Sequence, residues 1–333
     1  MKKLIWISAL LILVSCGRDR LDINVSNIDI TIQLKRYDQL IFGTDTAKVV
    51  SILKNNYIND SLFLNYYTGD ILHIGHVNDE VFPHYLQQFL SDTVVTKVAD
   101  SVLTIFNNFD MVEEQLTSAF KHYHYYFPEK VIPQIYTYIS GFNQSLMVAN
   151  DFAGIGLDRY LGSNFIYYKY LGIPNYKIRN MRPERIVPDL FYAWATTEYP
   201  NNDESATLLS EMIYEGKLIY YTEAMCPGLP DSVLMGYSAD QIKWCKKNEA
   251  NMWSFWAGHK LLYSTKRLDL QKYAGDAPFT NTFSPDSPGR TGIWTGWQIV
   301  RSYMNKHPEI TLEMLMQNNN AQELLSQSDY FPD

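Results

Sequence analysis

The clearest pattern in the chain is an amphipathic repeat between residues 207 and 226. Apolar side chains recur there at intervals of three and four residues, which predicts a helix with one broad buried face. Glu215 lies at the edge of that face, and Gly216 follows it although glycine costs a helix about 1 kcal/mol relative to alanine. A carboxylate at the rim of a core needs a cation, a hydrogen-bond donor or a metal ion as its partner. We therefore expect Glu215 to have such a partner, and Gly216 to mark a close approach of another backbone.

Helical periodicity also dominates the rest of the chain. It recurs over 38–41, 44–57, 80–90, 92–106, 112–127, 183–197, 239–263, 291–305 and 311–325. The segments between them are richer in polar, proline and glycine residues and are predicted as connectors, the longest being 57–67, 168–182, 227–238 and 274–289. These patterns predict a chain that is mostly helical.

Strand patterns are few. Residues 23–36 alternate between apolar and polar side chains, which indicates one half-buried strand. Further β-forming runs cover 132–142, 146–148 and 152–157, and the turn at Asn143 and Gln144 favours antiparallel pairing between neighbours. The predicted fold is α+β, with a small antiparallel sheet in a single globular domain over 23–333.

The N-terminus has the features of a lipoprotein signal. Lys2 and Lys3 precede an apolar run over 4–14 that is too short to span a bilayer comfortably. The sequence Leu-Val-Ser-Cys then ends at Cys16, as at a site of lipid attachment. We predict a signal peptide over 1–15, a lipidated Cys16 and a polar tether over 16–22. An ordinary signal peptide with an incidental cysteine is the alternative.

Composition and charge limit the classes of partner that the protein could have. The chain has 333 residues, 46% hydrophobic and 14% aromatic, which is ample for a large core. Its formal charge of -8 becomes -10 once the two lysines of the signal peptide are removed, and an acidic body argues against nucleic acid as a partner. Membrane attachment would then depend on the acyl chains at Cys16. Cys226 and Cys245 could form a disulfide or remain two free thiols.

Common catalytic motifs are missing from the sequence. There is no GxSxG, no GxxxxGK[ST], no GxGxxG after a strand and no CxxC. His73 and His76 are three apart and could bind a metal, although exposed or hydrogen-bonded histidines are the commoner reading. Glu211 and Glu215 could act as acid and base, but such i,i+4 pairs are more often one solvated and one salt-bridged carboxylate.

Two helices offer surfaces for close contact. Gly292 and Gly296 lie four apart on the helix over 291–305 and form a smooth face, to which Gly216 is the expected complement. In this arrangement Glu215 would be held by a cation or a hydroxyl group. Arg290, Lys217 and a tyrosine are the candidates.

Three segments resemble the family of the gliding-motility lipoprotein GldB. They are YISGFNQSLMVANDFAGIGLDRYLG at 138–162, MIYEGKLIYYTEAMCP at 212–227 and PGRTGIWTGWQIVRSYM at 288–304. With the lipoprotein start, the resemblance covers essentially the whole chain. It implies a protein required for gliding that works with a motility and secretion apparatus of the cell envelope, on a lipid anchor. The outer membrane, on the side facing the periplasm, is the favoured location.

The order of elements is also similar to that of gluzincin-like metallopeptidases. In those enzymes an HExxH helix supplies two zinc ligands and a base, and a glutamate on a following helix is the third ligand. Glu215 and Gly216 match that third position, but the corresponding helix at 185–197 has no histidine, and HExxH occurs nowhere in the chain. The resemblance thus implies a degenerate metallopeptidase-like fold without zinc or another cofactor.

We therefore predict a non-catalytic envelope lipoprotein that acts by contact with other gliding-motility proteins. A retained cleft could bind a peptide by strand addition at the hairpin edge. The candidate residues of this cleft are Asn143, Asp158, Tyr160, Glu215, Arg290 and Tyr303. Arg290 and Tyr303 are the expected partners of Glu215. The alternatives are a hydrolase with a non-standard site, in which Glu211 or Glu215 works with a zinc ion or a distant histidine, and a purely structural lipoprotein.

Overall fold

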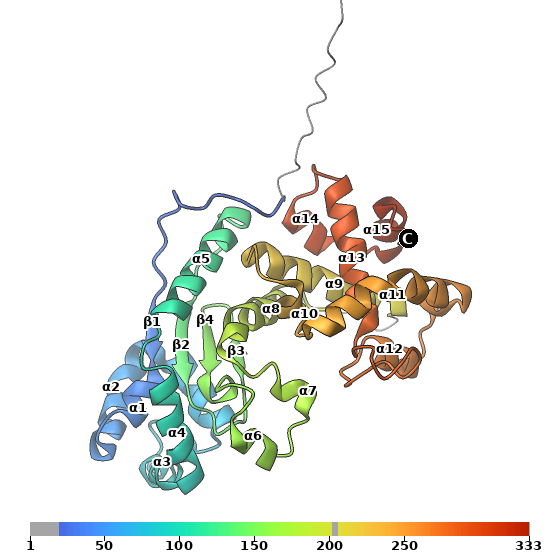
Figure 1. Cartoon of the computed structure of the whole chain (residues 1–333). Coiled ribbons are helices and arrows are strands. Elements are labelled where there is room, and N and C mark those ends of the chain that lie inside the picture. The colour runs from blue at the N-terminus through green and yellow to red at the C-terminus, as the bar shows by residue number, and fades with distance from the viewer. Residues whose placement is uncertain (1–19, 202–205, 333) are drawn as a thin grey trace, which may run out of the picture.

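The computed structural model describes residues 20–201 and 206–332 (Figure 1). Helices form most of this part of the chain and a small sheet lies among them, which confirms the predicted α+β class. Within the described residues, no helix is both long and apolar enough to cross a membrane.

The sheet is mixed, so the prediction of an antiparallel sheet was wrong in part. Its strands are β1 (Leu34–Arg36), β2 (Gln134–Tyr138), β3 (Leu146–Val148) and β4 (Phe152–Gly156), in the spatial order β1-β2-β4-β3. β1, β2 and β4 are parallel, and only β3 is antiparallel to its neighbour β4. After β2 the chain passes to the outer position of the sheet and forms β3. It then turns back and forms β4 between β2 and β3, so β4 is parallel to β2. Most of the strand expected over 23–36 is irregular.

The two faces of the sheet contribute to two separate hydrophobic clusters. Ile135 and Ile139 belong to the larger cluster, whereas Tyr136 and Tyr138, which alternate with them, belong to the smaller one. This division follows from the two-residue period of a strand, which points successive side chains to opposite faces.

Helices of the N-terminal half cover the sheet. They are α1 (Tyr37–Phe42), α2 (Thr46–Asn65), the π-helix η1 (Tyr66–Ile71), α3 (Phe82–Ser91), α4 (Thr93–Ile105) and α5 (Asp110–Tyr126). α2 and η1 run through the connector expected over 57–67. Asp60 explains the difference, because it is buried and accepts hydrogen bonds from Lys35, Tyr37 and Tyr136 at 2.6–2.9 Å. Asp60 has a non-helical backbone with φ of -119° and ψ of 20°, so α2 is kinked there, and this polar residue lies in the interior rather than in a surface loop.

The C-terminal half is almost entirely helical. Its first elements are the 3-10 helix η2 (Leu157–Arg159), α6 (Ile166–Tyr170), α7 (Asn175–Ile178), the 3-10 helix η3 (Pro183–Arg185), α8 (Ile186–Glu198) and α9 (Leu208–Met225). They are followed by α10 (Asp231–Met235), α11 (Ala239–Gly258), the 3-10 helix η4 (Leu261–Tyr263), α12 (Arg267–Tyr273), α13 (Thr291–Lys306), α14 (Leu312–Gln317) and α15 (Ala321–Ser328). Short helices thus occupy the connectors expected over 168–182 and 227–238. The helix expected over 311–325 is two helices, because Asn320 caps a new start through the Glu323 N–H.

The helix predicted over 207–226 is present as α9, and residues at its own N-terminus cap it. The Thr207 hydroxyl accepts from the Ser210 N–H, and the Ser210 hydroxyl accepts from the Thr207 N–H. This reciprocal pair satisfies two N–H groups at the start of the helix, which otherwise lack a partner. The boundary predicted at residue 207 is therefore confirmed.

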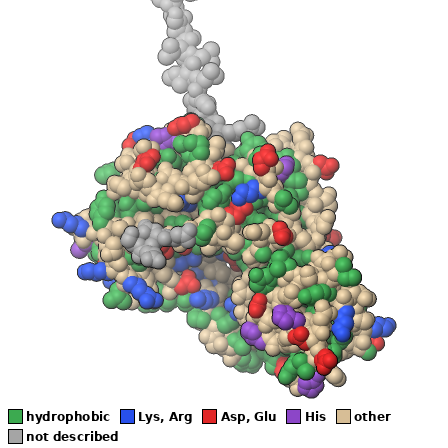
Figure 2. All heavy atoms as spheres, turned by 180° about the vertical axis from the view of Figure 1, so that it is seen from behind, with side chains coloured by type: hydrophobic (Ala, Val, Ile, Leu, Met, Phe, Trp, Pro, Cys, Tyr) green, Lys and Arg blue, Asp and Glu red, His purple; other side chains and the backbone are tan. Residues whose placement is uncertain are grey.

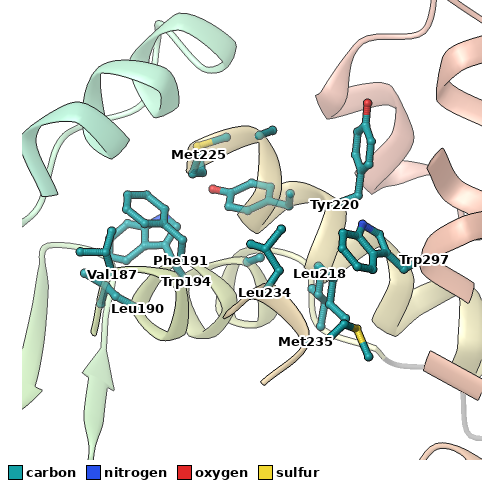
Figure 3. Close-up of a cluster of buried hydrophobic side chains, with 14 of the residues drawn as sticks. Val187, Leu190, Phe191, Trp194, Leu218, Tyr220, Met225, Leu234, Met235 and Trp297 are labelled. Carbon is teal, nitrogen blue, oxygen red and sulfur yellow. The ribbon is translucent and has the colours of Figure 1, made fainter. Parts of the chain in front are cut away.

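The predicted glycine contact between α9 and α13 is also confirmed. A Cβ atom on Gly216 would lie 2.4 Å from the carbonyl carbon of Gly296, and one on Gly296 would lie 1.7 Å from the carbonyl oxygen of Met212. Both distances are too short for any side chain, so the two backbones touch through their glycines. Around this contact, apolar side chains of α8, α9, α10 and α13 gather in one cluster (Figure 3), which includes Phe191, Leu218, Leu234 and Trp297.

Candidate functional site

Glu215 has its hydrogen-bond partner on α8. The Tyr192 hydroxyl donates to the Glu215 carboxylate, and Arg290 is near enough for its charge to stabilise the ionised form. Burial raises the pKa of Glu215, and both neighbours counteract that rise. Arg290 is thus one of the expected partners, but the hydroxyl comes from Tyr192 rather than from Tyr303.

Tyr303 and Lys217 lie elsewhere. Tyr303 follows Arg290 by thirteen residues along α13, which corresponds to about 20 Å of helix, and its ring packs 4.8 Å from that of His307. Lys217 points away from Glu215, because its ammonium group donates to the carbonyl oxygens of Met316 at 3.1 Å and Asn318 at 2.8 Å. The structure therefore separates both residues from Glu215.

Polar side chains on α8 and on Arg185, the residue just before it, extend the site beyond the predicted residues. Arg185 forms an ion pair with Asp189, and the Tyr160 hydroxyl donates to Asp189 at 3.3 Å. The charge of Arg290 also acts on Asp189. Tyr160, Arg185, Asp189, Tyr192, Glu215 and Arg290 together are called the α8 cluster below.

The sequence contained a signal for the members of this cluster that we did not predict. Arg185, Asp189 and Tyr192 are spaced by four and three residues, which places them on one face of a helix.

Asn143 and Asp158 brace a turn next to the sheet. Asp158 is fully buried and accepts from the backbone N–H groups of Ser140 at 3.0 Å and Phe142 at 2.6 Å. The turn needs this support because Phe142 has a left-handed backbone with φ of 66°. The Asn143 side chain donates to the carbonyl oxygen of Ile71 at 2.9 Å. Both residues thus make contacts that hold the turn in shape.

A cavity of about 340 Å³ opens beside the α8 cluster. Tyr160, Arg185, Asp189 and Arg290 line it, together with residues of α7, the end of α10 and the loop before α13. This cavity unites two of the six predicted cleft residues, Tyr160 and Arg290, and Glu215 interacts electrostatically with one of them. Asn143, Asp158, Glu215 and Tyr303 are not among its lining residues.

The histidines do not form a metal site with other side chains in the described structure. Purple histidine side chains are visible on the lower right part of the molecule in Figure 2, and His73 and His76 are both exposed. The His76 ring lies 3.2 Å from the side-chain oxygen of Asn65. Across residues 20–201 and 206–332, no three His, Cys, Asp or Glu side chains are grouped as metal ligands would be.

Glu211 has surroundings that differ from those of Glu215. Its carboxylate accepts from the Asn201 amide at 3.3 Å, and burial together with the nearby Glu215 raises its pKa. Among the described residues, no histidine forms a hydrogen bond with Glu211 or Glu215. The acid–base pair of the hydrolase alternative would therefore need a group other than these histidines.

The two cysteines of the body are free thiols. Cys245 is buried and Cys226 is half-buried, and they are not joined in a disulfide. Burial raises the pKa of the Cys226 thiol to about 12, so it is protonated at neutral pH. The choice that the sequence left open is thus resolved in favour of two unreactive thiols.

Comparison with known proteins identifies the family. A family model described as gliding motility protein GldB matches residues 18–332, which is nearly the whole chain. Neither a curated protein nor a solved structure matches the chain. The chain belongs to the family of gliding motility protein GldB.

Proposed function

We propose that this gliding-motility protein works as a non-catalytic binding component of the cell envelope. In this proposal the cavity beside the α8 cluster receives a segment of another protein of the motility or secretion apparatus. The observation that carries it is the hydrogen bond of Tyr192 to Glu215 with Arg290 beside them, because a hydroxyl and a cation meet the needs of a buried-edge carboxylate.

The proposal includes descent of the cleft from a metallopeptidase site. α8 and α9 pack against each other, as the two ligand-bearing helices of a gluzincin-like enzyme would. Tyr192 stands on the helix where such an enzyme has histidines, and it contacts the glutamate that would be the third ligand. A tyrosine in this place supports a pseudopeptidase, since a hydrogen-bonded phenol leaves Glu215 already satisfied.

The edge of the sheet offers a place for the bound segment. β3 is the last strand on its side of the sheet, and Ser145, immediately before it, lines the cavity. An extended peptide added to this edge would have one end near the α8 cluster. Strand addition at β3 thus fits a binding role.

Attachment to the membrane is the second part of the proposal. Cys16, the signal peptide at 1–15 and most of the tether at 16–22 lie outside the described residues. We infer that lipid on Cys16 holds the globular part, residues 23–333, at the outer membrane on the side facing the periplasm. Two or more acyl chains would make this attachment stable.

The decisive variant for the cleft is Glu215→Ala in the native cell. It should impair gliding, because Tyr192 and Arg290 lose the carboxylate that positions them beside the cavity. Colony spreading and single-cell movement are the measurements, with protein abundance and protease resistance checked in the same cells.

Glu211→Ala is the matched control, since it removes the same side chain one helical turn earlier and spares the contact with Tyr192. It should leave gliding intact. Normal gliding in Glu215→Ala cells that hold wild-type amounts of folded protein would contradict the proposed cleft.

Zinc content separates the pseudopeptidase from a metal-dependent hydrolase. Purified protein should contain well below one zinc ion per chain after mild chelation. Tightly bound zinc in stoichiometric amount would overturn the pseudopeptidase. Capture of the protein under native conditions without any other envelope protein would contradict the binding role as a whole.

A further inference from the structure

The cavity beside the α8 cluster has a charge opposite to that of the whole chain. Its described lining includes five basic side chains and two acidic ones, whereas the chain has a net charge of -8. The basic residues are Arg159, Lys177, Arg179, Arg185 and Arg290, and the acidic residues are Asp189 and Asp276. A local excess of cations inside a concave surface concentrates anions there.

The two carboxylates already have partners within this group. Asp189 pairs with Arg185, and Asp276 lies 3.1 Å from Lys177 and 4.0 Å from Arg290. These contacts compensate the acidic residues and hold three of the cations in place.

The excess of positive charge in the cavity comes from Arg159 and Arg179. In the described part of the chain, neither has a carboxylate within 4 Å. Arg159 donates to the carbonyl oxygen of Phe142 at 3.2 Å, and Arg179 donates to that of Gly236 at 3.3 Å. A guanidinium has five N–H donors, so a single carbonyl leaves most of this capacity for a ligand. Both side chains are only partly exposed, which favours an anion over water as their partner.

The remaining lining favours carboxylates of a peptide over a phosphate group. Asp189 and Asp276 would repel a dianion more strongly than a single carboxylate, and they can accept N–H groups of a peptide. Tyr176, Asn180 and Tyr237 add aromatic and hydrogen-bonding surface. At about 340 Å³ the cavity is near the lower end of ligand sites, large enough for one or two side chains of a longer chain.

We propose that this cavity binds the carboxylate groups of an acidic peptide segment, with Arg159 and Arg179 as its principal donors. The inference rests on the proposed binding role of the cleft and specifies the chemistry of the segment that enters it. Acidic residues within the segment, or its C-terminal carboxylate, would supply the same group.

Synthetic peptides test this chemistry on the full-length chain in detergent. The probes are a fluorescent hexapeptide with two central glutamates and an amidated C-terminus, its glutamine counterpart, and a glutamine peptide with a free C-terminus. Inorganic phosphate and free glutamate are the competitors. The glutamate peptide should bind at least about tenfold more tightly than its amidated glutamine counterpart, as expected for charge-assisted hydrogen bonds. Binding of the third peptide would assign the site to a C-terminal carboxylate.

Two variants connect binding to the cavity. Arg179→Gln should weaken binding of the preferred peptide about tenfold, and Lys177→Gln, at an exposed position where folding is not at risk, should weaken it less. Arg267→Gln is the matched control, because Arg267 is exposed on α12 and does not line the cavity.

The proposal is overturned if all three peptides bind equally, if none binds, if phosphate displaces the peptide at a lower concentration than free glutamate does, or if Arg179→Gln binds as the wild type does. Each of these outcomes can occur while Glu215→Ala still abolishes gliding. The proposal of an anionic ligand and the proposal that the cleft is needed for gliding can thus be contradicted independently.

Discussion

Lys217 illustrates how burial alters a single ionisable group in this protein. Lys217 is 3% exposed, and its ammonium group donates to two carbonyl oxygens, with no carboxylate of the described residues paired to it. Burial lowers its pKa to about 8, because the charged form loses its hydration. The unfolded chain would have a lysine pKa of about 10.4.

This difference predicts how stability changes with pH. Between about pH 8 and about pH 10.4 the unfolded chain binds more protons at this site than the folded chain, so the contribution of Lys217 to stability rises with pH. The free energy of unfolding of the wild type should therefore increase, relative to Lys217→Met, by about 3 kcal/mol across this range. Urea denaturation of both proteins at several pH values measures the difference, in which contributions of other groups cancel. Parallel pH profiles would show that Lys217 is not buried as a charge.

Individual residues of the site differ in how well the sequence predicted them. Glu215 was recognised because the helical period placed a carboxylate at the rim of an apolar face, and this depends only on neighbouring residues. Tyr192 was missed because its hydroxyl meets Glu215 through the packing of two helices. Nothing within the sequence of either helix specifies that their faces meet.

At the scale of elements, the pair α9 and α13 is the best-defined contact. Gly216 and Gly296 allow the two backbones to touch, and Trp294 and Trp297 on either side of Gly296 are buried. Glycine weakens each helix by about 1 kcal/mol, so its presence at these positions is explained by the contact.

Substitution of Gly296 tests this contact. Gly296→Ala should lower the free energy of unfolding by about 3 kcal/mol or more, because the new Cβ atom would overlap the Met212 carbonyl oxygen and force the helices apart. Gly258→Ala is the matched control, since a Cβ atom there meets nothing within 4 Å. It should leave stability unchanged or raise it by up to about 1 kcal/mol. Tryptophan fluorescence during urea denaturation reports both values, and an equal effect of the two substitutions would contradict the close contact.

Strand pairing was the least predictable property of the elements. The period-two pattern located β2, β3 and β4, but it gives no direction for their pairing. β1 pairs with β2 across about a hundred residues, and the register joins Leu34 to Ile135. Helices α1 to α5 lie between these strands in the sequence, so the pairing depends on how those helices pack.

At the scale of the whole molecule, charge is distributed unevenly. The chain is acidic overall, whereas the cavity beside the α8 cluster has an excess of basic side chains. Figure 2 shows a hollow near the middle of the face turned away in Figure 1, with both Lys or Arg and Asp or Glu side chains around it. An acidic surface with a basic cavity would direct an anionic segment toward one place.

The proposed lipid anchor concerns the attachment of the whole molecule to the membrane. Cys16→Ser should abolish labelling with a radioactive fatty acid and shift the protein from the membrane fraction to the soluble fraction, because acyl chains provide the hydrophobic attachment. Cys226→Ser is the control, since that thiol lies within the folded body and should not affect labelling. Membrane association that persists without the lipid would point to a protein contact as the anchor.

Most of the long helices, the start of α9 and the glycine face of α13 were predicted from the sequence, and its motifs indicated the GldB family. These properties depend on side chains a few residues apart or on motifs read in order. Packing between distant segments set the mixed sheet, the partner of Glu215, the separation of Tyr303 from the cleft and the basic cavity beside α8. Each of these depends on residues that are distant in sequence and meet only when helices and strands pack, and local periodicity cannot specify which faces meet.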